Sequence, residues 1–258
     1  MATPETTVDA FDQGSPTGGA TGEGTTTPAA NADHREVIDC DLCVIGAGSG
    51  GLSVAAAAAA FGQAVVLIEK HKMGGDCLNY GCVPSKALLA AGKRAHLIAT
   101  SSKFGISAEP PVIDHAAVNK HVHDVIATIE PNDSVERFTG LGVKVIQAAG
   151  RFANPETVIA GEYRIKARRF VIATGSTPFV PPIPGLENTP YFTNETLFDN
   201  REKLDHLIVV GGGPIGLEMA QAHRRLGSKV TVLEGATALA KDDPEMTRIV
   251  LEKIRDEG

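Results

Sequence analysis

One glycine-rich unit occurs twice in this chain, and the repeat constrains the fold more than any other feature. Each copy has an apolar run, three glycines spaced G-x-G-x-x-G, a stretch compatible with a helix, a second apolar run and a final glutamate. In both copies the glutamate follows the first glycine by the same interval. The residues are Gly46, Gly48, Gly51 and Glu69 in the first copy, and Gly211, Gly213, Gly216 and Glu234 in the second.

This pattern is typical of a strand–loop–helix–strand unit that binds a dinucleotide. The first glycine allows a tight turn, the second lets the backbone approach a pyrophosphate, and the third permits close packing of helix on strand. The pyrophosphate is expected at the helix N-terminus, and the glutamate is placed to accept hydrogen bonds from ribose hydroxyls. A lone copy would also fit an ordinary tight turn, but two complete copies favour two dinucleotides. The predicted class is α/β, with parallel sheets in a three-layer Rossmann-like fold.

A cysteine pair, Cys77 and Cys82, follows the first unit. On an ideal helix their Cα atoms would lie roughly 8 to 9 Å apart, whereas a disulfide needs about 4.4 to 6.8 Å. The backbone must therefore bend between them, and Gly81 gives it the freedom to do so. Pro84 suits the first turn of a new helix, so Cys82 is expected at a helix N-terminus, where a thiolate is stabilised. A cysteine pair beside a redox cofactor can accept two electrons, which indicates a redox enzyme.

The other two cysteines, Cys40 and Cys43, lie in the apolar run before the first glycine loop. They could in principle complete a four-thiolate zinc site with the first pair. Their odd spacing on one strand sends the side chains to opposite faces, so we expect core residues and no metal site. A further apolar strand is expected at residues 169–173, with a small antiparallel element before it at residues 158–165.

Composition and charge narrow the class of protein. The formal net charge of −7 argues against a nucleic-acid or membrane-surface partner, and no apolar run approaches the length of a membrane span. Residues 1–36 are rich in Thr, Gly, Pro and Ala, so we expect a disordered tail. The tail has no basic segment followed by an apolar one, which argues against a secretory signal. Four cysteines without a signal fit a reducing compartment, so the cytoplasm is expected.

Taken in order, the first glycine unit, the cysteine pair, the run Ala173-Thr174-Gly175 and the second glycine unit resemble a class I pyridine nucleotide-disulfide oxidoreductase. That family includes dihydrolipoamide dehydrogenase, glutathione reductase and mercuric reductase. The resemblance runs from about Asp39 to the end of the chain. Three runs, at residues 81–86, 131–138 and 193–196, most resemble the mercuric-reductase-like branch.

The resemblance implies that the first unit binds FAD and the second a nicotinamide cofactor. Further cofactor residues carried over from the family are Gly75, Thr174 and Gly175. The acid at the end of the second unit, Glu234, would repel the 2′-phosphate of NADP. The nearest basic residue after that strand is Lys241, so NAD is expected rather than NADP.

The resemblance also implies roles around the cysteines. Cys82 would be the thiolate that faces the flavin, and Cys77 the interchange thiol that attacks substrate. Lys86 would lie near the reactive edge of the flavin, paired with Glu218, although the two could also form an ordinary ion pair. Electrons would pass from the nicotinamide cofactor through the flavin to the disulfide, and then to a disulfide or metal-ion acceptor. Tyr80 departs from the small aliphatic residue common in better-known members, so substrate identity is not carried over.

The expected domains are an FAD-binding domain at residues 37–180, lacking its later segment, and a partial NAD-binding domain at residues 181–258. The family's C-terminal dimerisation domain, with its His-Glu acid–base pair, has no counterpart in the sequence given. We therefore expect the N-terminal part of a longer, homodimeric flavoenzyme. Two alternatives stay open, namely a non-catalytic nucleotide-binding fragment and a diaphorase or NADH oxidase with incidental thiols.

Overall fold

The computed structural model describes residues 34–258, of which Arg35–Gly258 form one unit by their contacts. The expected disordered tail lies outside the described residues apart from its last three, and Glu36 already belongs to a strand. The strands are β1 (Glu36–Ile45), β2 (Val65–Glu69), β3 (Lys144–Gln147), β4 (Gly150–Asn154), β5 (Thr157–Ala160), β6 (Tyr163–Ile172), β7 (His206–Val210) and β8 (Lys229–Leu233). The helices are α1 (Ser49–Ala60), α2 (Gly75–Asn79), α3 (Cys82–Ala99), α4 (His115–Ile129), α5 (Val135–Gly140), α6 (Asn194–Leu197), α7 (Pro214–Arg225) and α8 (Pro244–Asp256).

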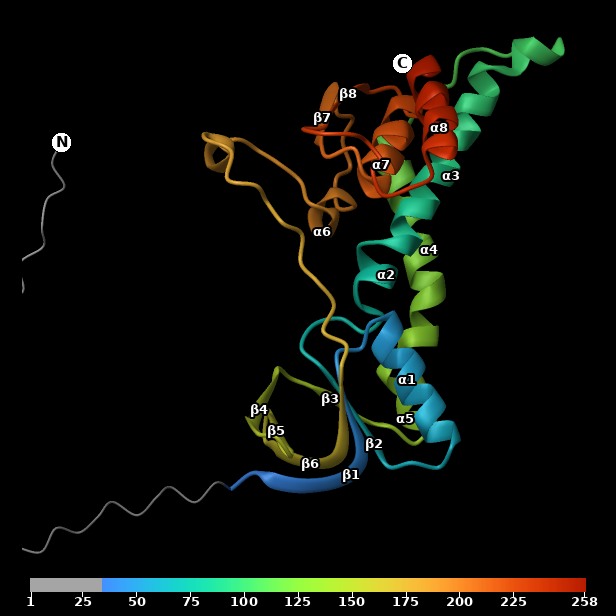
Figure 1. Cartoon of the computed structure of the whole chain (residues 1–258). Coiled ribbons are helices and arrows are strands. Elements are labelled where there is room, and N and C mark those ends of the chain that lie inside the picture. The colour runs from blue at the N-terminus through green and yellow to red at the C-terminus, as the bar shows by residue number, and fades with distance from the viewer. Residues whose placement is uncertain (1–33) are drawn as a thin grey trace, which may run out of the picture. The chain divides into compact units, whose positions relative to one another are not determined.

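Six of the strands form one mixed sheet in the order β3-β2-β1-β6-β5-β4 (Figure 1). Strands β3, β2, β1 and β6 run parallel, whereas β5 and β4 are antiparallel to their neighbours. The expectation of parallel sheets is therefore wrong for this end of the sheet. The reason is the length of β6, which runs parallel to β1 throughout and also pairs with β5 over its first four residues. The small antiparallel element is confirmed, since Val158 pairs with Ile165.

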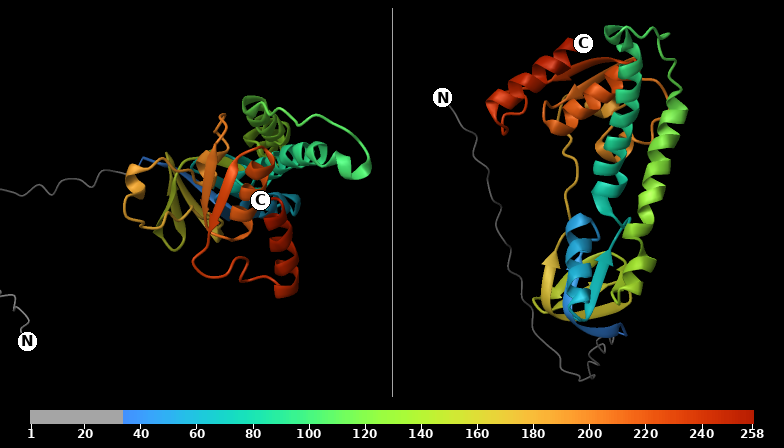
Figure 2. Two further views of the ribbon diagram at one scale, coloured as in Figure 1. Left: turned by 90° about the horizontal axis from the view of Figure 1, so that it is seen from above. Right: turned by 90° about the vertical axis from the view of Figure 1, so that its right-hand side faces the viewer.

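Alternation along the central strands supplies apolar side chains to both faces of the sheet. Val44 and Leu67 pack in one cluster with Leu52 of α1 and Phe138 of α5, and α1 lies against the strands in Figure 2. On the other face, Cys43, Val66 and Ile68 pack against residues of β5 and β6. The helices thus cover one face, and the antiparallel strands help to bury the other.

A bulge in β1 changes which way its first cysteine points. The backbone N–H groups of Asp41 and of the next residue both donate to the Ala64 carbonyl oxygen, at 2.9 and 3.1 Å. The two N–H groups share one acceptor where β1 begins to pair with β2, and the side-chain alternation shifts by one residue there. The register of β1 with β6 is the same on both sides of Asp41. Cys40 contacts the same cluster that contains Cys43, so the prediction of opposite faces is wrong. The prediction that Cys43 is a core residue is confirmed, and burial raises its pKa to about 12.

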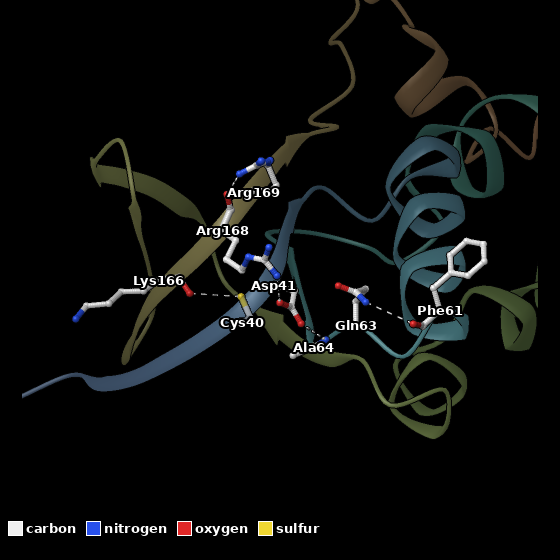
Figure 3. A network of polar contacts seen from close by, with 8 residues as sticks. All are labelled: Cys40, Asp41, Phe61, Gln63, Ala64, Lys166, Arg168 and Arg169. Atoms are coloured by element: carbon white, nitrogen blue, oxygen red, sulfur yellow. Dashed lines mark hydrogen bonds and ion pairs between the residues drawn. The ribbon is translucent and has the colours of Figure 1, made fainter.

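Polar contacts hold this bulge in place (Figure 3). The Asp41 carboxylate accepts hydrogen bonds from the Ala64 N–H at 3.0 Å and from the Arg168 guanidinium at 3.1 Å. These two contacts lower the pKa of Asp41, the backbone hydrogen bond more than the arginine. The Cys40 thiol lies 3.6 Å from the carbonyl oxygen of Lys166, and burial raises its pKa to about 11. Both features favour a structural role for Cys40.

The second glycine unit forms its own small parallel sheet, in which β7 pairs with β8. Helix α7 packs on α3, and Met219 and Ala222 of α7 share a buried cluster with Ala87 and Leu88 of α3. The two helices approach closely, since a Cβ at Gly92 would lie 3.1 Å from the Ala222 carbonyl oxygen. Within residues 34–258 every helix is too short or too polar to cross a membrane.

Candidate functional site

The first glycine loop joins β1 to α1 in the tight geometry that the sequence predicts. Gly46 has a φ of 107°, in the left-handed region that favours glycine. A Cβ on Gly51 would overlap the Gly46 carbonyl oxygen, so this glycine lets α1 begin directly against the loop. Gly48 is the N-cap of α1 and has no side chain to satisfy the helix's first N–H groups. These groups are available to an anion such as a pyrophosphate.

The second loop repeats this geometry between β7 and α7. Gly211 has a φ of 117°, and a Cβ on Gly216 would overlap the Gly211 carbonyl oxygen. Gly213 is the N-cap of α7, which has proline at its first position. Both loops therefore offer the cradle for a dinucleotide that their glycine spacing indicates.

The glutamate at the end of each unit holds its own loop by hydrogen bonds. Glu69 accepts from the N–H groups of Ala47 and His71, both at 2.7 Å. Glu234 accepts from Gly212 at 2.8 Å and from Ala236 at 2.9 Å, and these backbone donors lower its pKa. From the sequence, these carboxylates were predicted to bind only ribose, and their hydrogen bonds to the loop backbone were not predicted. The equal interval between the first glycine and the glutamate in the two units was the sequence feature that could have indicated this role.

The segment that carries the cysteines packs directly against the first glycine loop. The Gly74 N–H donates to the Ala47 carbonyl oxygen at 2.9 Å. Gly75 has a φ of 57°, and a Cβ there would lie 2.6 Å from the Cα of Gly48. Only glycine suits this contact, which places Gly75 beside the loop two residues before Cys77.

The end of β6 also reaches the first loop. The N–H of Ala173 donates to the Ile45 carbonyl oxygen at 2.8 Å, and its own carbonyl oxygen lies where a Cβ on Gly46 would be. Thr174 borders the same space, and Gly175 follows with a φ of 68°. The structure thus brings these residues to the loop that the first unit forms.

The cysteines lie on successive helices, with the bend between them that their spacing requires. Cys77 is in the short α2, and α3 begins at Cys82. Cys82 is exposed and Cys77 is half-buried, and both carry free thiols. Burial, followed by a side-chain hydrogen bond with Cys82, raises the pKa of Cys77 to about 11. The Cys82 side chain is thus among the groups that act on the Cys77 thiol, so the two cysteines are near each other, as a pair that exchanges between dithiol and disulfide must be.

Lys86 and Glu218 meet although 132 residues separate them along the chain. The Lys86 ammonium lies 2.8 Å from both carboxylate oxygens of Glu218. The pair joins the fifth residues of α3 and α7, and therefore the cysteine helix to the second glycine unit. With side chains 61 % and 38 % exposed, the pair contributes little to stability. The pair fixes the Lys86 ammonium one turn along α3 from Cys82.

Two hollows in the described part of the chain are lined by residues other than the cysteine pair. A 750 Å³ hollow lies at the bulge in β1, lined by residues that include Cys40, Asp41 and Arg168. A 440 Å³ hollow lies between α7, β8 and α8 and includes Glu234 in its lining. The second hollow adjoins the carboxylate expected to contact a nicotinamide dinucleotide.

Comparisons with known proteins agree with this geometry. Residues 40–258 match the family described as pyridine nucleotide-disulphide oxidoreductase. Mercuric reductase from Streptomyces lividans is 35 % identical over 224 residues, which cover 84 % of this chain and 47 % of the relative. Dihydrolipoyl dehydrogenase from Synechocystis sp. is 35 % identical over 230 residues, covering 85 % of this chain and 48 % of the relative.

A solved structure extends the likeness to the fold. The Cu(II) complex of the HOCl-induced flavoprotein disulfide reductase RclA from Escherichia coli superposes with a TM-score of 0.72 at 28 % identity. The match covers 84 % of this chain and 47 % of that one, so the chain spans about half the length of the relatives that it matches. The chain belongs to the pyridine nucleotide-disulphide oxidoreductase family.

Proposed function

We propose that the protein, as part of a longer homodimeric cytoplasmic flavoenzyme, transfers electrons from NADH to a Cys77–Cys82 disulfide and on to an external acceptor. The acceptor is a disulfide or a metal ion, the latter suggested by mercuric reductase relatives and by the Cu(II) complex of RclA. The observation that supports this proposal most strongly is the direct contact between the cysteine segment and the first glycine loop. Gly74 donates a hydrogen bond to that loop, and Gly75 packs against it. A dinucleotide bound at that loop would lie beside the thiols.

The residues of both loops suit the two dinucleotides that the family implies. FAD at the first loop and NAD at the second would supply the transfer of two electrons between NADH and the disulfide. In the overall reaction NADH, a proton and the disulfide give NAD⁺ and two thiols. The uncapped N-terminus of α1 would bind the pyrophosphate of FAD, and the open second loop that of NAD. Glu234 disfavours the extra phosphate of NADP, because it would place two negative charges together.

The residues near the thiols then have distinct tasks. Cys82, exposed at the start of α3, is the thiol nearest the flavin in this proposal. Cys77 exchanges with the acceptor. Lys86, fixed by Glu218, holds a positive charge one turn from Cys82, where it would favour negative charge on a bound flavin.

The test is Cys82→Ser in the flavin-loaded protein, compared with wild type for two activities. Reduction of a dye by NADH should largely survive, whereas reduction of a disulfide or of a metal ion should be lost. Survival of both activities would favour the diaphorase reading, in which the thiols are incidental. A protein that binds neither FAD nor NADH would instead be a non-catalytic fragment. Comparing NADH with NADPH in the dye assay tests the proposed role of Glu234.

A further inference from the structure

One side chain from a distant part of the chain holds the segment between the two cysteines. The Asn194 amide nitrogen donates to the Asp76 carboxylate at 2.9 Å and lies 3.5 Å from the Tyr80 carbonyl oxygen. Asp76 immediately precedes Cys77, and Tyr80 comes two residues before Cys82. A single amide group therefore contacts both ends of the loop that must bend to bring the two sulfur atoms together.

Asp76 completes this arrangement from within the loop. Its carbonyl oxygen accepts a hydrogen bond from the Tyr80 N–H at 2.8 Å. Its second carboxylate oxygen lies 2.7 Å from the position that a Cβ on Gly81 would occupy. The carboxylate thus fills the space left by Gly81 on one side and binds Asn194 on the other. Its position couples the backbone beside one cysteine to the backbone beside the other.

Asn194 is itself held firmly. It is the first residue of α6, which begins with a capping box in which the Thr193 N–H donates to the Thr196 hydroxyl at 3.0 Å. Just beyond α6, Phe198 is 7 % exposed, and its carbonyl oxygen accepts from the Asn119 amide at 2.7 Å. Both ends of α6 are anchored, so Asn194 is a fixed point for the cysteine loop.

We propose that Asn194 is a positioning residue for the redox pair, acting through Asp76 to keep Cys77 and Cys82 at the separation from which a disulfide closes. This inference shares one requirement with the proposed function, namely that Cys77 and Cys82 form a disulfide. The physical effect is on effective concentration, because a loop that is already bent loses less conformational freedom when the bond forms. Without Asn194 the loop would sample more conformations, and the dithiol would be favoured over the disulfide.

The test is the equilibrium with glutathione, which needs neither FAD nor NADH. In this reaction the two thiols and oxidised glutathione give the Cys77–Cys82 disulfide and two reduced glutathiones. The fraction oxidised is read after acid quenching, alkylation and peptide mapping, which separates this pair from the other cysteines. Asn194→Ala should lower the equilibrium constant for disulfide formation about three- to tenfold. The matched control is Asn188→Ala, which removes an exposed side-chain amide that donates to the neighbouring Glu187 at 3.3 Å and should match wild type.

A swap of the two partners separates positioning from general stability. Asn194→Asp alone places a carboxylate against Asp76 and should lower the constant at least as much as Asn194→Ala. Asp76→Asn combined with Asn194→Asp restores the donor–acceptor contact between positions 76 and 194 at unchanged net charge, although not the contact with the Tyr80 carbonyl oxygen, and should recover part of the wild-type constant. The swap also keeps the proposal testable if Asn194→Ala fails to fold, as judged by circular dichroism.

The outcomes are distinguishable. Wild type that oxidises at this pair, a weakened Asn194→Ala and recovery in the swap would support the proposal. Wild type that oxidises normally, with folded Asn194 variants that match it or form the disulfide more readily, would overturn the positioning role and leave the proposed function intact. Failure of wild type to form this disulfide at any glutathione ratio would overturn both.

Discussion

Replacing His223 should change how the stability of the chain depends on pH. His223 lies on α7 and is 7 % exposed, and its Nε2 atom has no hydrogen-bond partner among the described residues. Burial, and then the charge of nearby His115, lowers its pKa from 6.5 to about 4. Once unfolded, the side chain returns to its ordinary pKa of about 6.5.

The sign and size of the change in unfolding free energy follow from the difference in proton binding by His223 between the folded and unfolded states. At about pH 7.5, one unit above the unfolded pKa, the imidazole is almost wholly neutral in both states and has almost no effect. As the pH falls, the unfolded state takes up the proton first, so the folded state loses relative stability until the pH is below the folded pKa. The loss is about 2 kcal/mol at pH 5 and about 3 kcal/mol at pH 4, because each unit of pKa difference corresponds to about 1.36 kcal/mol.

Urea unfolding followed by circular dichroism measures this loss directly. Wild type and His223→Gln should be compared from about pH 7.5 down to about pH 4, since groups common to both cancel in the difference. The stability of His223→Gln relative to wild type should rise by about 2 kcal/mol between pH 7.5 and pH 5. The control His121→Gln changes an exposed histidine of α4 and should run parallel to wild type. Parallel curves for wild type and His223→Gln would refute the reasoning.

Three further outcomes test other parts of the structure. Gly51→Ala should abolish FAD binding, measured by flavin fluorescence, because its Cβ would overlap the Gly46 carbonyl oxygen; retained binding would contradict the loop geometry. Iodoacetamide should label Cys82 faster than Cys77, because Cys82 is exposed and the pKa of Cys77 is raised to about 11; mass spectrometry of timed samples would reveal any reverse order. Phe138→Ala should lower the free energy of unfolding by about 3–5 kcal/mol, since Phe138 is only 1 % exposed. Urea unfolding measures this loss, and a value below about 1 kcal/mol would show that the surrounding side chains close the cavity.

The local rules of glycine chemistry account for the parts of the fold that the sequence predicted well. The three glycines of each unit meet real steric demands, as the overlap at Gly51 and the left-handed backbone of Gly46 show. The bend between Cys77 and Cys82 follows from the geometry of a disulfide alone. The pairing of Lys86 with Glu218 came from family resemblance, because no local pattern indicates a contact across 132 residues.

The parts that were wrong or missed depend on contacts between distant segments. The bulge at Asp41 arises where two N–H groups share the Ala64 carbonyl oxygen. The alternation of residue types along β1 does not indicate it. The antiparallel extension of the main sheet depends on β6 being long enough to pair on both sides. The contact between Asn194 and Asp76 was not predicted, because the two residues are 118 positions apart in the sequence. Asn194 entered the sequence analysis only within residues 193–196, which resemble the mercuric-reductase-like branch.

The two glutamates that hold the glycine loops have a consequence for ligand affinity. A carboxylate offers about four lone-pair positions, and Glu69 uses its oxygens for two backbone donors while capacity remains for a ribose hydroxyl. The loop is therefore ordered when the chain folds, and its conformational entropy is lost before a dinucleotide arrives. Binding then needs less free energy to organise the site. The same arrangement at Glu234 would let both dinucleotides gain affinity from preorganisation, without any additional contact to the ligand.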